Sequence, residues 1–568
     1  MKLNVSHLQQ AWVGLARKGE AARQAATTNN KKAKQANREA ELAATQPKES
    51  PTPTSASAPI TTKFKPFRVP GRVNGELAQF TRERRVAPGQ PMFDPVRPGA
   101  LVLPRPPPGH ALHTERLVDV VVDPFVSRHL RPHQREGITF LYPVLLGFRS
   151  LQGEAGMAAA EGAVLGDEMG LGKTLQTVGL VWTLLKQSPI AGATLARKVL
   201  IVAPSSLLRN WEAEFRKWLG SERLTIHVAD TGEKVAQFRS YNTAPVLILS
   251  YEMLVRAEAE VKRIGWDFIV CDEAHRMKNA AIKTSSALAG LACKRKLLLT
   301  GTPIQNDLGE FYNLLELACP GLLGTRQQFR QLEAAVEAGR RSDCETEERE
   351  AGRAAMAGIL DTAGKVMIRR TSAAISRHLP PRTVSLVFCR PGEYQAKLYS
   401  RAAVDLLESG QAGPAHLAAI QTLRKLCNAP GLVGEVAGAW AGGPPTWEEQ
   451  AGKLAVLTCL LLGLEATHEK MVIVSLSTAT LDLLADLCSR YSVSTCRLDG
   501  STPAAARQGL VNTFNRSEEP RVFLLSSKAG GTGLNLTGAS RLVLYDIDWN
   551  PAVDLQVGSY FGKHTAVS

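Results

Sequence analysis

The segment LGDEMGLGKTLQT at residues 165–177 decides the fold, because a glycine-rich loop that opens a helix is a phosphate-binding element. Glycines lack a Cβ atom and let consecutive backbone amides close around phosphate oxygens. Lys173 would reach the terminal phosphates, and Thr174 would ligate magnesium. The strict pattern G-x-x-x-x-G-K-[ST] requires glycine at position 167, where Asp167 stands. The segment predicts an ATP site formed by Asp167, Glu168, Met169, Gly170, Leu171, Gly172, Lys173 and Thr174.

A second motif with matching chemistry follows about 100 residues downstream. The apolar run at 268–272 reads as a strand, and it continues as Asp272-Glu273-Ala274-His275. Asp272 would hold magnesium, and Glu273 would orient or deprotonate the attacking water. A solvated acidic strand end is the plainer alternative, but both motifs in this order favour a catalytic role. His275 is either a satisfied core histidine or a link between nucleotide state and the neighbouring loop, and we favour the link.

Short apolar runs alternate with helical patterns around these motifs, which predicts parallel sheets with crossover helices. Predicted strands lie at 199–204, 246–250, 268–272 and 296–300, and a second series lies at 471–476, 522–527 and 541–546. Residues 310–450 look helical, with a charged loop at 342–350. The sequence therefore predicts an α/β fold with two doubly wound parallel-sheet lobes and helical insertions.

Charge is the unusual feature of an otherwise ordinary composition. The 568 residues carry 68 Lys and Arg against 53 Asp and Glu, a net charge of +15, which suggests a polyanionic partner such as nucleic acid or a solvated basic tail. Residues 1–100 hold 17 of the basic and 7 of the acidic residues, and residues 47–132 hold 16 of the 32 prolines. We therefore expect residues 1–116 to form a basic, proline-rich and largely disordered arm.

The remaining composition excludes several classes of protein. With 44% hydrophobic and 21% charged residues, the chain is neither wholly disordered nor collagen-like. No stretch approaches the roughly 18 consecutive apolar residues of a membrane span, and the N-terminus has no apolar run of signal-peptide length. The nine cysteines never occur as C-x-x-C, which indicates reduced thiols rather than zinc sites. We expect a protein of the cytosol or nucleus with no membrane partner.

Eight motifs occur in an order that resembles the Swi/Snf-type ATPases of helicase superfamily two. They are LRPHQREGITFLY (130–142), DEMGLGKT (167–174), APSSLLRNWEAEF (203–215), DEAH (272–275), LTGTPIQND (299–307), RLDGST (497–502), SSKAGGTGLNL (526–536) and DIDWNPA (546–552). The resemblance covers roughly residues 120–556. Phrases such as ALVLPRP at 100–106 and LYDIDWNPA at 544–552 look most like the recombination-repair translocases of the Rad fifty-four B type.

The resemblance implies two RecA-like lobes, at 117–315 and 451–568, joined by helical insertions and a linker at 316–450. It implies that Gln134 reads the adenine edge and that His275, Thr300, Gly301, Thr302 and Gln556 couple the phosphate state to the lobe interface. It places DNA-phosphate contacts at Ser205, Ser206, Asp499, Gly500, Ser501, Ser527, Gly530, Gly531 and Thr532. Hydroxyl and glycine positions suit this task because backbone amides can approach phosphates without reading bases.

The activity implied is that of a nuclear translocase driven by ATP and Mg²⁺, acting on double-stranded and branched DNA. In this family such a motor works in homologous recombination and double-strand-break repair with a strand-exchange recombinase. A nucleosome remodeller acting on chromatin is a rival hypothesis. The sequence contains no bromodomain-like or chromodomain-like pattern beside the motor, which disfavours it.

The sequence departs from the family after DWNPAVDLQ at 548–556. Two family arginines would fall on Tyr560 and Lys563, and the sequence stops at Ser568. An arginine reaching the transferring phosphate contributes about 10³–10⁵ in rate in related hydrolases, and lysine lacks its forked donor geometry. We therefore predict a truncated lobe that binds ATP and hydrolyses it poorly, with a non-catalytic DNA- and recombinase-binding scaffold as the alternative.

Overall fold

The computed structural model describes residues 90–113, 117–149, 161–240, 244–274, 281–301, 308–341, 343–371, 373–374, 383–408, 414–433, 451–467, 469–530, 534, 536–549, 554 and 558. Most of the predicted basic arm lies outside these residues. Within the arm range, residues 90–113 contribute to the core of the first lobe, because Leu101 and Leu103 are buried in it. Arg105 forms an ion pair with Asp119 at 2.7 Å on the adjoining segment.

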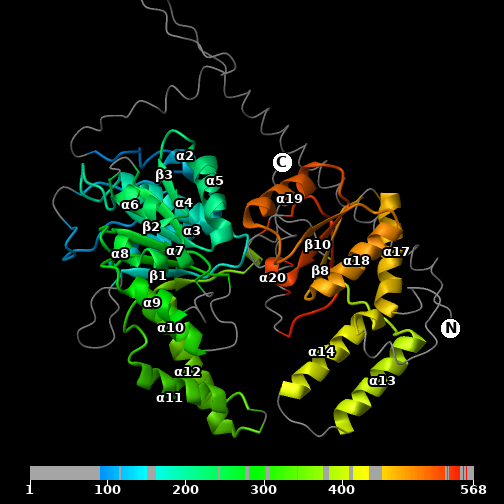
Figure 1. Ribbon diagram of the computed structural model, residues 1–568. Coiled ribbons are helices and arrows are strands. Elements are labelled where there is room, and N and C mark those ends of the chain that lie inside the picture. The colour runs from blue at the N-terminus through cyan, green and yellow to red at the C-terminus, as the bar shows by residue number, and fades with distance from the viewer. Residues whose placement is uncertain are drawn as a thin grey trace, which may run out of the picture. The chain divides into compact units, whose positions relative to one another are not determined.

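The first lobe is built on a seven-stranded sheet in which every strand pair is parallel (Figure 1). The strand order is β3-β4-β2-β5-β6-β1-β7. The strands are β1 Gly162–Leu165, β2 Val199–Ala203, β3 Ile226–Ala229, β4 Val246–Ser250, β5 Phe268–Cys271, β6 Lys296–Leu299 and β7 Met367–Ile368. The central strands β1, β2, β4, β5 and β6 are buried along their whole length. Continuous burial is typical of a parallel sheet that is covered on both faces.

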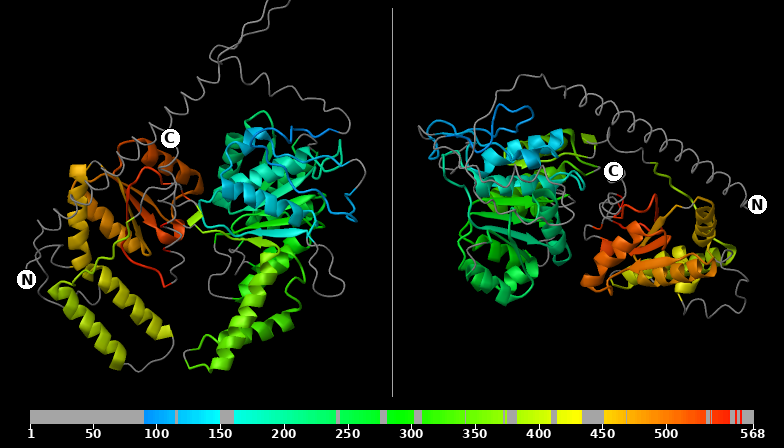
Figure 2. Two further views of the ribbon diagram at one scale, coloured as in Figure 1. Left: turned by 180° about the vertical axis from the view of Figure 1, so that it is seen from behind. Right: turned by 90° about the horizontal axis from the view of Figure 1, so that it is seen from above.

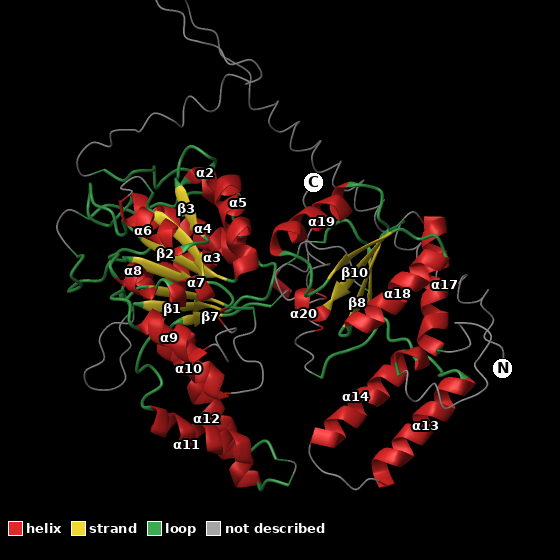
Figure 3. Ribbon diagram, viewed as in Figure 1, coloured by secondary structure: helices red, strands yellow, loops and turns green. Residues whose placement is uncertain are grey.

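Helices enclose this sheet, as Figure 3 shows. They are α2 Pro124–Ser127, α3 Pro132–Leu145, α4 Lys173–Lys186, the 3₁₀ turn η1 Ser205–Leu207, α5 Leu208–Leu219, α6 Gly232–Ser240, α7 Tyr251–Arg256, α8 Glu258–Lys262, α9 Ala281–Ala289 and α10 Leu308–Ala318. α3 packs on α4, and α4 packs on α5. The helix that begins at Lys173, the predicted phosphate-binding lysine, is therefore held by its neighbours on two sides.

Two further helices, α11 Arg326–Ala338 and α12 Thr346–Gly364, pack on each other beyond α10 (Figure 2). Their contact is close, because a Cβ atom on Gly339 would lie 3.1 Å from Cα of Gly352. The predicted charged loop at 342–350 is wrong from residue 346 onward. Glu345 and Glu348 form a capping box there and start α12, and acidic residues in a first helical turn are favoured by the helix dipole.

The second lobe has a four-stranded sheet, which is also parallel throughout. Its order is β11-β8-β10-β9, with β8 Met471–Ser475, β9 Thr495–Leu498, β10 Val522–Ser526 and β11 Arg541–Leu544. The helices of this part are α13 Glu393–Glu408, α14 Pro414–Asn428, the 3₁₀ turn η4 Pro430–Leu432, α17 Gly452–Thr467, α18 Thr478–Arg490, α19 Ala504–Arg516 and α20 Ser527–Gly530. Phe514 of α19 meets Phe523 of β10 edge-to-face at 5.1 Å in its core.

The two parallel sheets with their helices confirm the predicted fold class. All seven predicted strands are present, whereas β1, β3, β7 and β9 were not predicted. Within the part of the chain that the structure describes, no helix is both long and apolar enough to cross a membrane.

Candidate active site

The predicted site residues of the first lobe, apart from Gln134 in α3, follow four neighbouring strands. β2, β5, β6 and β1 lie side by side in the sheet. They lead respectively into Ser205, Asp272, Thr300 and the loop that begins at Gly166. Because carboxyl ends of parallel strands meet at one edge, the sheet brings the predicted phosphate, magnesium, coupling and DNA positions to a single edge.

The phosphate-binding loop has the backbone shape that its glycines predict. Gly170 and Gly172 have φ angles of +77° and +78°, in the left-handed region that favours glycine. A Cβ atom on Gly172 would lie 2.1 Å from Nε2 of Gln134, so a side chain does not fit there. Gly301, which follows β6, packs against the same loop, where a Cβ atom would lie 2.8 Å from Cγ of Met169. The missing Cβ atoms of Gly172 and Gly301 therefore make room for the side chains of Gln134 and Met169, which pack directly against the backbone there.

Lys173 begins α4 and points back along the loop. Its Nζ donates to the carbonyl of Asp167 at 2.8 Å. Burial lowers the pKa of Lys173, and the charges of Glu273 and Asp272 oppose this shift. The lysine therefore shares one electrostatic environment with both acids of the second motif.

Asp272 is fixed by partners from two helices and by the residue that follows it. Nε1 of Trp211 in α5 donates to Oδ2 at 2.8 Å, the amide of Glu273 donates to Oδ1 at 2.9 Å, and the Tyr251 hydroxyl donates to the Asp272 carbonyl at 2.7 Å. Burial raises the pKa of Asp272, the Glu273 carboxylate raises it further, and the bond from Trp211 opposes both. A bound cation would relieve this unfavourable charge.

Glu273 is buried and has a φ angle of +50°, which is unusual for a residue with a side chain. Such strained backbone persists where the surrounding structure over-determines it, and it is concentrated at functional sites. This conformation turns the chain sharply between Asp272 and Ala274.

Asp167 occupies the position where the strict motif has glycine, and the structure shows what it does there. It is fully buried and accepts two bonds from Arg370, from Nε at 2.9 Å and from Nη2 at 2.6 Å. Gln176 donates to the same carboxylate at 3.1 Å. Arg370 also donates to the carbonyl of His133, and its own carbonyl accepts the amide of Glu168 at 2.9 Å. A residue 203 positions away therefore anchors the start of the phosphate-binding loop.

Gln134 is buried against the phosphate-binding loop. Its Oε1 accepts the amide of Arg131 at 2.9 Å, and its Nε2 donates to the carbonyl of Leu171 at 3.1 Å. The side chain thus joins the start of α3 to the loop. Its role in reading adenine stays a prediction.

The donor set at this edge fits a magnesium nucleotide. Thr174 lies in the first turn of α4 and contributes a hydroxyl, and Asp272 contributes a carboxylate. Mg²⁺ prefers such oxygen ligands and keeps most of its coordination for water and phosphate. The left-handed glycines supply the phosphate cradle, so the residues present fit ATP with Mg²⁺.

The predicted coupling residues are only partly described. Thr300 is buried, and its amide donates to the Leu165 carbonyl at 3.1 Å, which ties β6 to the strand before the phosphate loop. A Cβ atom on Gly301 would lie 3.8 Å from Nζ of Lys173. His275, Thr302 and Gln556 lie outside the described residues.

The predicted DNA contacts of the first lobe are accessible. Ser205 is exposed and Ser206 is half-buried, and both lie in η1 between β2 and α5.

In the second lobe, the loop after β9 is held by hydrogen bonds between residues that are close in sequence. The buried Asp499 accepts from the Ser501 hydroxyl at 2.6 Å and from Nε of Arg497 at 2.7 Å, and these bonds lower the pKa of Asp499. Gly500 and Ser501 are exposed. Asp499 therefore stabilises the loop from a buried position, and the residues of the loop that are exposed are the adjacent Gly500 and Ser501.

The remaining predicted DNA contacts follow β10. Ser527 starts α20, and its buried hydroxyl has no hydrogen-bond partner among the described residues. Gly530 ends the same short helix. Gly531 and Thr532 lie outside the described residues.

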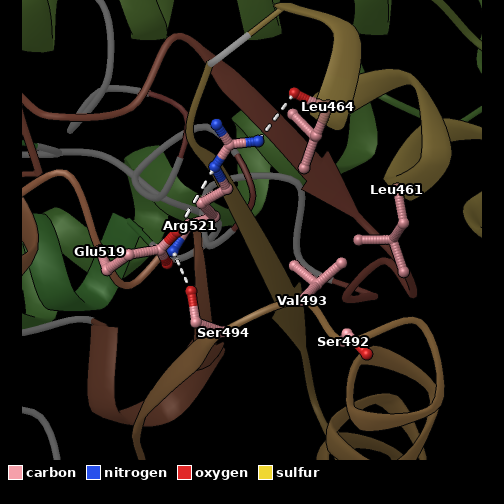
Figure 4. Close-up of a pocket in the computed structure, with 7 residues that line it drawn as sticks. All are labelled: Leu461, Leu464, Ser492, Val493, Ser494, Glu519 and Arg521. Carbon is pink, nitrogen blue, oxygen red and sulfur yellow. Dashed lines mark hydrogen bonds and ion pairs between the residues drawn. The ribbon is translucent and has the colours of Figure 1, made fainter.

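The second lobe also contains a small cavity of about 270 Å³. Figure 4 shows the residues that line it. Ser494 and Arg521 line it at the amino ends of β9 and β10. Arg521 donates through its amide to Oγ of Ser494 at 3.1 Å and through Nη1 to the Leu464 carbonyl at 3.2 Å. The predicted DNA-binding residues follow the carboxyl ends of the same strands, so the cavity is not part of that site.

Comparison with known families agrees with this arrangement. Residues 133–432 match the SNF2-related domain, and residues 452–558 match the helicase conserved C-terminal domain. The chain is 42% identical over 508 residues to the DNA repair and recombination protein RAD54B of Mus musculus. The chain belongs to the Rad54-type SWI2/SNF2 ATPases. The predicted family resemblance is therefore confirmed.

The matches to this SWI2/SNF2 chain include different shares of the relatives' own lengths. The match to mouse RAD54B includes 83% of the chain but 56% of that protein, so the chain spans little more than half of its length. The DNA repair and recombination protein RAD54-like of Danio rerio is 39% identical over 533 residues, which include 87% of the chain and 71% of that protein. A solved structure, the Sulfolobus solfataricus SWI2/SNF2 ATPase core in complex with dsDNA, is 22% identical with a TM-score of 0.36, covering 78% of this chain and 86% of that one.

Sequence reasoning missed two residues of this SWI2/SNF2 site, Trp211 and Arg370. Trp211 lies inside a recognised motif, but its motif does not reveal that the indole faces Asp272, 61 positions away. For Arg370 a signal existed, because an aspartate in a glycine position of a phosphate loop needs a buried cationic partner. The sequence does not say which arginine provides it.

Proposed function

We propose that this chain is an ATP-dependent duplex-DNA translocase of the nucleus that acts in homologous recombination and double-strand-break repair with a strand-exchange recombinase. The observation that carries the proposal is the single sheet edge that holds Lys173, Asp272 and the exposed Ser205. The names of the relatives, DNA repair and recombination proteins, support the biological setting.

In this proposal the first lobe binds and activates the nucleotide. Lys173 binds the terminal phosphates, and Thr174 and Asp272 hold magnesium, which when bound neutralises phosphate charge. Glu273 orients the attacking water, and its fixed backbone sets the direction of the carboxylate. Arg370 keeps Asp167 and the loop backbone in place.

DNA would be held through its phosphates by positions on both lobes, and the predicted positions lie within residues 117–315 and 451–568. Ser205 and Ser206 serve the first lobe, and Gly500 and Ser501 serve the second. Contacts of this kind fix the register on the duplex without reading its sequence. Alternate tightening of the two lobes with the ATP cycle would move the motor along the duplex.

The test is ATP turnover of the purified chain with and without duplex DNA, combined with displacement of a triplex-forming strand as a measure of translocation. We expect duplex DNA to stimulate turnover, at a low level because Tyr560 and Lys563 stand at the family's arginine positions, and we expect Lys173→Ala to abolish both activities. A chain that binds neither ATP nor duplex DNA would contradict the proposal.

The same assays separate the scaffold alternative. A chain that binds ATP and DNA but shows no turnover would act as a scaffold, and Tyr560→Arg combined with Lys563→Arg should then restore hydrolysis. Branch migration without sliding of nucleosomes would favour recombination over nucleosome remodelling.

A further inference from the structure

Trp211 connects the predicted DNA-contacting turn to the predicted magnesium-binding carboxylate. It lies in the first turn of α5, which directly follows η1 with Ser205 and Ser206. Its side chain is buried, with 1% of its surface exposed. Its single N–H donor is used on Oδ2 of Asp272 at 2.8 Å.

The segment that leads from β2 to Trp211 also contacts Asp272 through the backbone. Val202 pairs with Cys271 in the register of β2 and β5, and the amide of Asp272 donates to the Val202 carbonyl at 2.8 Å. Residues 202–211 therefore contact Asp272 at their beginning and at their end. Between these two contacts the chain carries the exposed Ser205.

We propose that Trp211 is a positioning residue that couples duplex-DNA binding at Ser205 and Ser206 to the binding of Mg²⁺ and ATP at Asp272. The inference rests on the proposed function. A phosphate bound at η1 shifts the first turn of α5, and the indole moves with it because α5 continues η1 without a break. A hydrogen bond weakens steeply when its angle changes, and a bond to a carboxylate is among the stronger ones. The coordinating oxygen of Asp272 thereby senses whether DNA is bound.

Packing alone is the competing explanation for Trp211. Its ring lies 6.0 Å from that of Phe215, and both are buried in the core of the lobe. Trp211→Phe keeps an aromatic ring and removes the N–H. Trp182→Phe is a matched control, because Nε1 of Trp182 donates to Oδ2 of Asp123 at 2.9 Å in the same lobe.

The experiment is a binding cycle that needs no hydrolysis. The affinity of a fluorescent, non-hydrolysable ATP analogue is measured with and without a short DNA duplex, first with Mg²⁺ and then with EDTA. By linkage, the factor by which DNA changes nucleotide affinity equals the factor by which nucleotide changes DNA affinity, and typical values are about 5–150. Both directions are measured for each variant.

With Mg²⁺, we expect a coupling factor of about 10 in the wild type, in the usual range, and below about 2 in Trp211→Phe. Nucleotide affinity without DNA is expected to fall in Trp211→Phe, because Trp211 holds Asp272, but the coupling factor is a ratio measured within each variant and does not depend on that fall. Trp182→Phe should keep the wild-type factor. With EDTA, the wild type and Trp211→Phe should give equal coupling factors, because the proposed coupling acts through the metal bound at Asp272. If Trp211→Phe fails to fold, replacing Trp211 by the isosteric benzothienyl-alanine removes the N–H alone.

Two results would overturn the inference, and they are distinguishable. A normal coupling factor in Trp211→Phe, or in the isosteric variant, would reduce Trp211 to a packing residue and leave the proposed function intact. A factor of one in the wild type would contradict the proposed function, and this inference would fail with it.

Discussion

The two lobes present their predicted site residues in different ways. At the edge of the first sheet, side chains bind partners from distant parts of the chain, as Trp211 binds Asp272 and Arg370 binds Asp167. In the loop after β9 of the second lobe, Asp499 binds Arg497 and Ser501, each two positions away. Catalytic groups must be held at fixed positions by supporting contacts, whereas contacts to a DNA backbone need only accessible donors on a stable turn.

Removing the arginine that anchors the phosphate loop should have the largest effect. Arg370→Ala leaves the fully buried Asp167 without its cationic partner, and loss of one member of a buried pair costs about 3–5 kcal/mol of unfolding free energy. Urea unfolding measures this change. Arg216→Ala is the control, since Arg216 pairs with Glu212 while 64% of its side chain is exposed, and it should cost at most about 1 kcal/mol.

The double variant distinguishes pairing from packing. Arg370→Ala combined with Asp167→Ala removes both charges, so it should recover part of the stability lost in Arg370→Ala. If Arg370→Ala and Arg216→Ala lower the unfolding free energy equally, the buried pair of Arg370 with Asp167 stabilises the first lobe no more than an exposed ion pair does.

A smaller effect is expected from a substitution that makes the predicted phosphate-binding loop collide with Gln134. Gly172→Ala places a Cβ atom 2.1 Å from Nε2 of Gln134 at a φ angle of +78°. Because the collision forces Gln134 or the loop backbone away from its present position, nucleotide affinity should fall about tenfold, which corresponds to about 1.4 kcal/mol of binding free energy. Titration of a fluorescent ATP analogue measures the change.

Gly192→Ala provides an unusually close control for this substitution. Gly192 has the same φ angle of +78° but nothing within 4 Å of a built Cβ atom. It should cost stability through the backbone and leave nucleotide affinity unchanged. If both variants lose nucleotide affinity equally, the cause is general destabilisation and not the collision with Gln134.

The contrast between the lobes also explains what the sequence could predict. The strands β2, β4, β5 and β10 are nearly continuous apolar runs and were predicted as strands for that reason. β7 has two residues, and β9 is half-buried at a sheet edge, so neither shows a clear pattern. Local motifs reveal Lys173, Asp272 and the Asp499 loop because their residues are adjacent in sequence.

Partners across strands were missed for a different reason. Arg370 reaches Asp167 because β7 pairs with β1, and strand order in a parallel sheet is not encoded in any one segment. The buried hydroxyl of Ser527 likewise shows that a residue type suited to phosphate binding need not be exposed.

The smallest effect should come from the second lobe. Asp499→Asn keeps the size of the side chain and weakens its bonds with Arg497 near the end of β9 and with Ser501 in the loop. Because a single hydrogen bond contributes about 0.5–1.5 kcal/mol, affinity for a DNA duplex should fall by less than about tenfold. Fluorescence anisotropy at fixed salt measures it, and nucleotide affinity without DNA should be unchanged, since all of these bonds lie within the second lobe. Loss of nucleotide affinity in Asp499→Asn would mean that this loop is not self-contained, and the distinction between the two lobes would fail.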